Sequence, residues 1–191
     1  MEIGTTLNLT NRKDWRNWLQ ENHQSKKEIW LVFYLKDSGK PFLPYDEAVE
    51  EALCFGWIDS IIKKLEADSR AQRFSRRNPK SNLSELNKER VRRMIKAGKM
   101  TPAGLERIKK HLVSNEKGEL EPIPFVMPED IIKRLKKDPV VWENFQNFPD
   151  FYKDIRIGFI DNAREQPDVF EKRLGYFIKM TAENKRFGSL T

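Results

Sequence analysis

The stretch EIWLVFYLK, residues 28–36, decides the fold of the first part of the chain. Its seven consecutive apolar residues, from Ile29 to Leu35, are rich in aromatic and β-branched types, which favours a strand buried on both faces. The next four residues, DSGK, form a turn signal in which Gly39 supplies a positive φ. The stretch therefore predicts a central β-strand near residues 28–36.

Amphipathic segments on both sides of this strand predict helices. Residues 45–55 carry an apolar stripe with four acidic residues opposite it, and Gly56 follows where a helix commonly ends. Residues 11–22 carry Trp15 and Trp18 one helical turn apart. We expect both tryptophans to lie in the core.

A second strand signal follows the acidic helix. Residues 57–65 (WIDSIIKKL) and 70–77 (RAQRFSRR) have strand character and flank a turn signal at 67–69, which predicts an antiparallel hairpin. Beyond residue 84 the apolar periodicity is helical, and several prolines mark helix starts.

These elements predict an α+β fold with a helical C-terminal module. The expected small antiparallel sheet has strands near 28–36, 57–65 and 70–77 and packs with helices. The expected domains are an α+β domain over 1–113, a linker over 114–127 and the helical module over 128–191.

Composition excludes several classes of protein. The chain of 191 residues is 38% hydrophobic, and its longest apolar run is far below the about 18 residues of a membrane span. The start of the chain lacks a basic segment followed by an apolar one, so we expect no signal peptide and a cytoplasmic location. Cys54, His23 and His111 lack the spacing of metal ligands, and no cofactor-binding motif is present, so we expect neither a metal nor a cofactor.

The positive charge is concentrated in one segment. The whole chain has a formal net charge of +7, whereas residues 63–110 hold sixteen Lys and Arg against five Asp and Glu, a net of +11. Such a segment attracts phosphates, carboxylates or a nucleic-acid backbone. The alternative is that these side chains form solvated helix faces.

Asp59 is the candidate catalytic residue. Strand alternation places it between the large apolar residues Trp57 and Ile61, where a carboxylate needs a cation or a proton. A hairpin folded about 67–68 brings Arg76 opposite Asp59, and a slip of one residue brings Arg77 there instead. Asp59 is then either half of a structural ion pair or a proton acceptor in a site.

A candidate anion-binding corner follows the hairpin. Arginine side chains suit two-pronged contacts to phosphate or carboxylate, and the next loop leads into a helix start. The alternative is that the arginines bind internally to the acidic helix at Glu47, Glu50 and Glu51. The predicted ligand-binding residues are Arg73, Arg76, Arg77, Lys80, Ser81, Arg90 and Arg93.

Three motifs carry a family resemblance: residues 52–60 (ALCFGWIDS), the polar residues of 73–87 around 79–82 (PKSN), and residues 98–104 (GKMTPAG). Their order and spacing resemble the YdeI/OmpD-associated family of bacterial proteins, also named bacteriocin-protection proteins. The resemblance spans about residues 15–112, and residues 128–187 are similar to the family's C-terminal helical module. Arg76 and Leu83 stand where the family pattern has Pro and Trp.

The resemblance implies a soluble bacterial protein connected by name with tolerance of bacteriocins, and it brings no catalytic residue with it. We favour a non-enzymatic protein that binds an anionic small molecule or phosphate-bearing ligand through its basic surface. One alternative is a nucleic-acid-binding module that uses the basic segment 63–110. Another is an enzyme acting on a small anionic substrate, with Asp59 in the pocket and Arg73 or Arg77 as the anchor. A cationic peptide is disfavoured as a direct ligand, because like charges repel.

Overall fold

The computed structural model describes residues 2–188, and within that range it contains eight α-helices, a four-stranded sheet and a two-stranded sheet. The predicted α+β class is confirmed. The chain forms two compact units: unit 1 comprises the residues up to Asn82 together with Arg90–Pro122, and unit 2 comprises Leu83–Glu89 and the residues from Ile123 onward.

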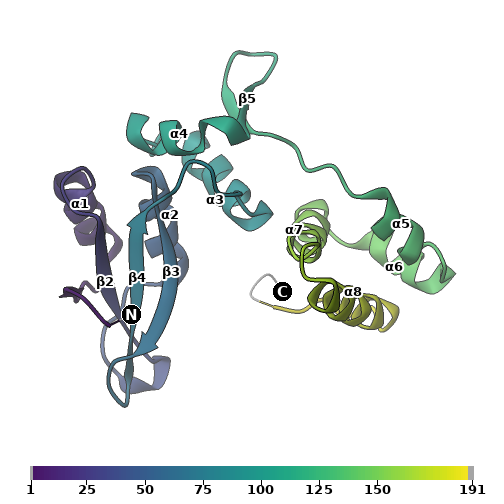
Figure 1. The fold of residues 1–191 in the computed structure, drawn as a ribbon, viewed down its shortest axis with the longest axis horizontal. Helices are drawn as coiled ribbons and strands as arrows, with labels where there is room; N and C mark the ends of the chain where they lie inside the picture. The colour runs from purple at the N-terminus through teal and green to yellow at the C-terminus, as the bar shows by residue number, and fades with distance from the viewer. Residues whose placement is uncertain (1, 189–191) are drawn as a thin grey trace. The chain divides into compact units, whose positions relative to one another are not determined.

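The four-stranded sheet of unit 1 contains the three predicted strands and one that the sequence did not reveal. Its order is β1–β2–β4–β3, and Figure 1 shows β2, β4 and β3 side by side. The added strand, β1, has only two residues, too few to show alternation, and pairs in parallel with β2. The strands are β1 (Thr6–Leu7), β2 (Glu28–Tyr34), β3 (Trp57–Lys64) and β4 (Ser69–Arg76).

The register of the β3–β4 hairpin corrects the predicted pairing of Asp59. Phe74 lies opposite Asp59, and Arg76 lies opposite Trp57, so pairing with either Arg76 or Arg77 is wrong. The turn accounts for one residue of the error, and a bulge between Asp59 and Ile62 adds the second. The bulge is stabilised by the buried side chain of Gln72, whose amide donates to the carbonyl oxygen of Ser60 at 3.0 Å.

Two helices of unit 1 pack near the strands through aromatic side chains. They are α1 (Arg12–Asn22) and α2 (Tyr45–Cys54). Trp15 of α1 is fully buried, meets the ring of Phe74 edge to face at 5.4 Å, and donates from its indole to the carbonyl oxygen of Ala48 at 2.9 Å. Trp18 meets the ring of Trp57 in the same manner at 5.8 Å. The indole pair therefore joins α1 to both α2 and the hairpin.

Two of the four acidic residues of α2, Glu50 and Glu51, are buried beside arginines rather than exposed to water. Glu51 is 1% exposed, and its two carboxylate oxygens each accept a hydrogen bond at 2.5 Å, one from Arg12 and one from Arg16. Glu50 binds Arg12 at 2.9 Å and Arg93 at 2.7 Å. These paired charges satisfy each other in a partly buried setting, where a lone carboxylate is strongly unfavourable.

The remaining elements of the first 122 residues are short, apart from one helix. A 3₁₀ turn, η1, ends at Gly39, which has the positive φ expected of it. The β5–β6 hairpin falls largely within the stretch expected to be a linker. The elements are η1 (Lys36–Ser38), α3 (Glu85–Lys96), α4 (Pro102–Ile108), η2 (Lys109–His111), β5 (Leu112–Ser114) and β6 (Leu120–Pro122).

Unit 2 is helical, and its core is built from aromatic and branched side chains. Tyr152, Ile157 and Leu174 are fully buried, and Phe145 meets Phe177 edge to face at 6.2 Å. The helices are α5 (Glu129–Leu135), α6 (Pro139–Asn147), α7 (Asp150–Asp161) and α8 (Pro167–Ala182).

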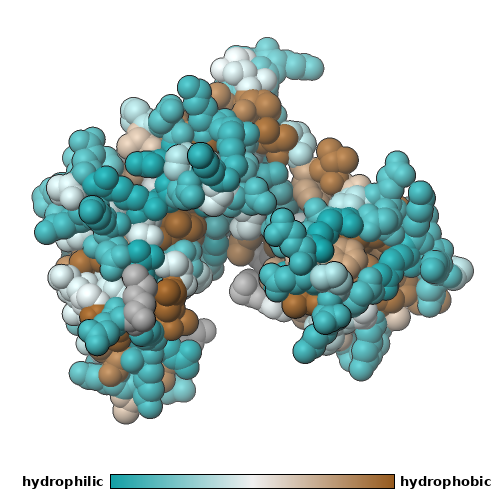
Figure 2. Space-filling view, viewed as in Figure 1, coloured by the Kyte–Doolittle hydropathy of each residue, from teal (hydrophilic) through white to brown (hydrophobic). Residues whose placement is uncertain are grey.

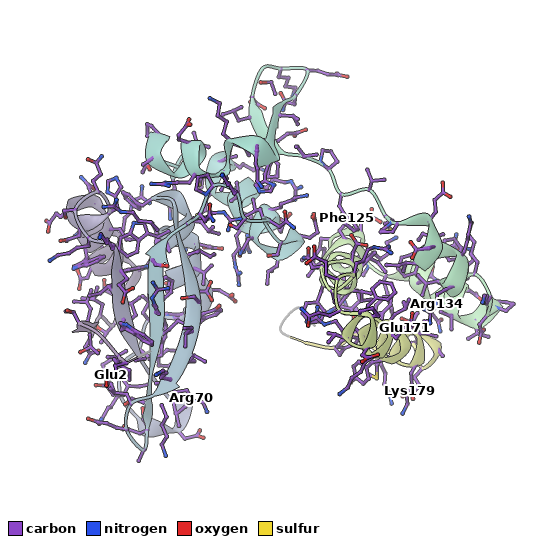
Figure 3. All side chains as sticks on the ribbon, in the orientation of Figure 1. Glu2, Arg70, Phe125, Arg134, Glu171 and Lys179 are labelled. Carbon is purple, nitrogen blue, oxygen red and sulfur yellow. The ribbon has the colours of Figure 1, made fainter. Side chains whose placement is uncertain are left out.

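Charged residues join and cover the helices of unit 2. Figure 3 labels Arg134 on α5 and Glu171 on α8, whose ion pair at 2.6 Å joins these two helices. Figure 2 shows hydrophilic residues over most of the visible face of the molecule, with hydrophobic residues in smaller groups between them.

Replacing Glu51 with Gln should destabilise unit 1. The change leaves Arg12 and Arg16 without their shared carboxylate, and we expect the free energy of unfolding to fall by about 3 kcal/mol, because both arginines keep partial contact with water. Urea unfolding followed by tryptophan fluorescence measures the change. Glu47→Gln, on the same helix, is the control and should change stability by less than about 0.5 kcal/mol. Equal effects of the two variants would contradict the assigned role of Glu51.

Candidate functional site

The structure places the predicted ligand-binding residues at several separate positions. Arg73 lies on β4 and makes two hydrogen bonds to one carboxylate oxygen of Glu28, from Nη2 at 2.6 Å and from Nε at 2.9 Å. Hydrogen bonding to Arg73 holds the pKa of Glu28 below its usual range. Arg73 is therefore committed to an ion pair on the sheet.

Arg77, Lys80 and Ser81 belong to the loop that follows β4. Arg77 is 3% exposed and donates to the carbonyl oxygens of Ser81 at 3.2 Å and Asn82 at 2.5 Å. Burial lowers the pKa of Arg77 from its usual range. The carbonyl oxygen of Lys80 accepts a hydrogen bond from Lys110 at 2.6 Å. Cationic side chains therefore hold this loop through its carbonyl groups.

Arg90 and Arg93 lie on α3 and face the acidic helix α2. Arg90 is buried and binds Asp46, and Arg93 binds Glu50 at 2.7 Å. The alternative interpretation, in which the arginines of the hairpin bind the acidic helix, is not what the structure shows: Arg73 binds Glu28, and Arg77 binds backbone carbonyl groups. The carboxylates of α2 are bound instead by arginines of α1 and α3.

Asp59, the candidate catalytic residue, is bound by a tyrosine. The hydroxyl of Tyr45, at the start of α2, donates to its carboxylate at 2.6 Å. Burial and the neighbouring Asp59 carboxylate raise the pKa of Tyr45 above its usual range. The pair ties α2 to β3 and lies outside the pocket described next.

A pocket of about 160 Å³ lies where the first and third sequence motifs meet. It collects residues from the end of α1, the α2–β3 junction, the end of β4 and the helix α4. We call it the motif pocket. Its lining residues are His23, Gln24, Phe55, Gly56, Trp57, Arg76, Ala103 and Arg107.

Gly56 sets the shape of this pocket. Its φ of +74° ends α2 in the left-handed conformation that favours glycine. A Cβ atom at this position would lie 2.6 Å from Cγ of Arg107, so the stem of Arg107 rests directly on the glycine. The residue is required both for the turn and for the close approach of α4.

The helix α4 is fixed to the end of α2 through Cys54. Thr101 caps α4, and both its backbone N–H and its hydroxyl donate to the carbonyl oxygen of Cys54, at 3.0 and 2.7 Å. A Cβ atom on Gly104 would lie 2.2 Å from the same oxygen. The motif GKMTPAG therefore has a packing explanation, which is to hold Arg107 beside the α2–β3 junction.

The motif pocket has a positive lining. None of the eight described residues that line it is acidic, and Arg76, Arg107 and His23 are basic types. Arg76 donates to the carbonyl oxygens of Lys26 and Gln24, which leaves further N–H groups of its guanidinium for a ligand. Within residues 2–188, no hydrogen bond or ion pair of the Arg107 guanidinium is found. Arg107, which lines the pocket, therefore carries a cationic group without a partner in the described residues.

Two carbonyl groups at the helix ends near this pocket are already bonded. The carbonyl oxygen of Leu19, near the end of α1, accepts from His23, and that of Cys54 accepts from Thr101. A helix C-terminus with bare carbonyls repels an anion. Here that repulsion is reduced, so the cationic side chains determine which ligand charge the pocket prefers.

A larger hollow of about 340 Å³ lies beside the β3–β4 turn. Its lining combines basic residues with Glu66 and the exposed apolar side chains of Leu35 and Ile62. This mixed lining gives no preference for one ligand charge.

His23 and Arg107 are site residues that the sequence did not single out. Arg76 is the one predicted ligand-binding residue among the described residues that line the motif pocket. The available signal was the pair of glycine-containing motifs, FGW and TPAG, which indicate close backbone approaches. Nothing local in the sequence shows that the two motifs meet.

The geometry defines a class of protein with two units. One is an α+β unit with a basic pocket, and the other is helical. Residues 7–107 match the model of a family described as a domain of unknown function (DUF8412), and residues 124–184 match the family described as bacteriocin-protection, YdeI or OmpD-associated. The first match covers more than half of the chain, and the chain belongs to that family. No curated protein and no solved structure matches the chain.

The comparisons confirm the predicted resemblance over part of the chain. The YdeI/OmpD-associated model matches the helical region, whereas the three motifs that suggested that family lie in the region matched by the other model. The match fits a protein of bacteriocin-protection type. Among the described helices, none combines the length and apolar character needed to cross a bilayer.

Cys54 should be unreactive in the folded protein. The residue is fully buried, and burial raises the pKa of its thiol to about 11, so little of the reactive thiolate forms near neutral pH. A chromogenic disulfide reagent at about pH 8 should label it at less than about one hundredth of the rate measured in denaturant. Rapid labelling of the native protein would contradict this assignment.

Gly104→Ala should disrupt the docking of α4. The added methyl group meets the carbonyl oxygen of Cys54, and we expect a loss of about 2–3 kcal/mol in the free energy of unfolding, measured by urea denaturation. Gly175→Ala is the control, because an added Cβ atom there meets nothing within 4 Å. That change, in the interior of α8, should be neutral or stabilise by up to about 1 kcal/mol. A neutral Gly104→Ala would show that α4 has room to move.

Proposed function

We propose that the protein binds a small oxyanion in the motif pocket, with Arg76 and Arg107 as the charged contacts. The suitable groups are phosphate, sulfate, or the carboxylate of a small molecule. The observation that carries the proposal concerns Arg107: this residue lines the pocket, and its guanidinium has no hydrogen bond or ion pair within residues 2–188.

The size of the pocket favours a small ligand. Its volume is about 160 Å³. Pockets for larger organic ligands begin at about 300 Å³. An oxyanion and a few attached atoms fit, whereas a nucleotide has to leave most of its atoms outside.

The charge of the lining favours an anion. Two arginines from different elements, Arg76 from β4 and Arg107 from α4, line the pocket, and none of its described lining residues carries a carboxylate. A charge-assisted hydrogen bond to an oxyanion is stronger than a neutral one, and a guanidinium can donate two at once.

The match to the bacteriocin-protection family suggests a process in which this anion binding takes part. A cationic peptide is a poor occupant for a pocket lined by arginines, because the charges repel. We therefore propose an indirect role in tolerance, in which the protein responds to an anionic small molecule rather than capturing the toxin.

Arg107→Gln should weaken the binding of sulfate and phosphate. The variant removes the free positive charge but keeps a polar side chain of similar length, and we expect the dissociation constant to rise about tenfold or more in low-salt isothermal titration. Lys96→Gln is the control, because it removes the same charge from an exposed position of α3 outside the pocket.

Two results would count against this function. One is sulfate binding of equal strength in the parent protein and in Arg107→Gln. The other is tight, strongly salt-dependent binding of a DNA or RNA duplex that Lys96→Gln weakens and Arg107→Gln does not, which would favour the nucleic-acid alternative.

A further inference from the structure

His23 lies at the C-terminal end of α1 and is held there by several contacts. It caps the helix, its backbone N–H donates to the carbonyl oxygen of Leu19 at 2.9 Å, and its ring packs against Phe55 with centroids 5.2 Å apart. Its own carbonyl oxygen accepts a hydrogen bond from the indole of Trp57 at 3.2 Å. The backbone of His23 is therefore fixed by α1 and β3, and its ring packs on Phe55.

The second hydrogen bond of His23 decides what its ring offers to the pocket. Nδ1 lies 2.9 Å from the carbonyl oxygen of Leu19, and a carbonyl oxygen only accepts, so Nδ1 carries a hydrogen. Nε2 remains as the other ring nitrogen, and no partner for it is found in the described part of the chain. In the neutral ring Nε2 has a lone pair, which repels an anion, whereas in the charged ring it donates.

Charged residues from several elements lie around His23 and the motif pocket. Arg76 from β4 and Arg107 from α4 line the same pocket, and Arg16 of α1 lies over the ring of Phe55 at 5.1 Å. Glu51 is bonded to Arg16, and the thiol of Cys54 is buried at the end of α2. The neighbouring segments also carry Glu21, Lys26, Lys27 and, on α4, the exposed Glu106. A third positive charge beside two guanidinium groups is unfavourable until an anion lies between them.

We propose that His23 is the third ligand contact of the motif pocket, and that an oxyanion binds there together with one proton, which the imidazole takes from water. The proposal rests on the proposed function of the pocket, and it adds that a proton is taken up when the anion binds. The bound state has a protonated ring that donates from Nδ1 to Leu19 and from Nε2 to the anion, beside the two guanidinium groups. Anion binding is therefore coupled to the uptake of one proton by His23, and the affinity for the anion rises as the pH falls.

Sulfate is the suitable probe, because its own charge stays constant between about pH 5.5 and about pH 8.5, the range in which histidine changes charge. Isothermal titration in this range should show an affinity that is highest at the acid end and falls by up to tenfold per pH unit at the alkaline end, as the uptake of one proton requires. Titrations at one pH in two buffers with different heats of ionisation should show the uptake of up to one proton per sulfate bound.

His23→Gln is the decisive variant. Its amide supplies a donor near Nε2 but takes up no proton, so sulfate should still bind, with an affinity independent of pH and a heat independent of the buffer. His111→Gln is the matched control. His111 is the other histidine of the chain and its Nε2 lies 3.1 Å from the carbonyl oxygen of Ser81, outside the pocket, so its replacement should keep the pH dependence.

A measurement on the parent protein avoids any loss of folding in the variant. The chain has two histidines, so the proton resonances of their rings can be assigned with His111→Gln and followed by NMR. Sulfate should move the titration of His23 toward higher pH by a measurable shift and leave that of His111 unchanged.

The outcomes separate this inference from the proposed function. If sulfate binds with the same affinity across the pH range, or if His23→Gln keeps the parent's pH dependence, the proton-coupled role of His23 is wrong and anion binding stands. If no sulfate binds at any pH in the folded protein, the proposed function fails as well.

Discussion

The buried carboxylate of Glu51 is the interaction on which unit 1 depends. An acidic side chain with 1% exposure on α2 is tolerable only because Arg12 and Arg16 of α1 bind both of its oxygens. The requirement fixes the distance and rotation between α1 and α2, and with them the positions of Trp15, Trp18 and His23 on α1. The aromatic contacts with the hairpin follow from the same placement.

Internal ion pairs of this kind also use many of the basic residues of unit 1. The arginines of α3 that face α2 neutralise its carboxylates, Arg73 neutralises Glu28, and Arg77 is used to hold a loop. A net charge counted along the sequence therefore overstates the cationic surface. Two arginines of unit 1, Arg76 and Arg107, line the motif pocket, where no described lining residue is acidic. The motif pocket, rather than the whole basic segment 63–110, can discriminate between anions.

Local sequence patterns predicted the helices and strands. The features that the sequence did not predict depend on contacts between distant segments. The strand at residues 28–36, the helix α2 and the hairpin were predictable, because the pattern that indicates each of them lies within a short stretch of sequence. The pairing of Asp59 was not, because a bulge inserts a residue without a strong local signal. The pocket was not either, since it requires His23, Gly56 and Arg107 to meet across the fold, and only the glycines hinted at a close approach.

The edges of the sheet carry a consequence for the behaviour of the protein in a crowded cell. One edge strand, β1, is two residues long, and the other, β3, is interrupted by its bulge and continues into Lys63 and Lys64. A short edge, a bulge and lysines all discourage another chain from adding to a sheet. The molecule thus keeps its strands from templating intermolecular aggregation, even though the central strand beside them is among the most apolar sequences in the chain.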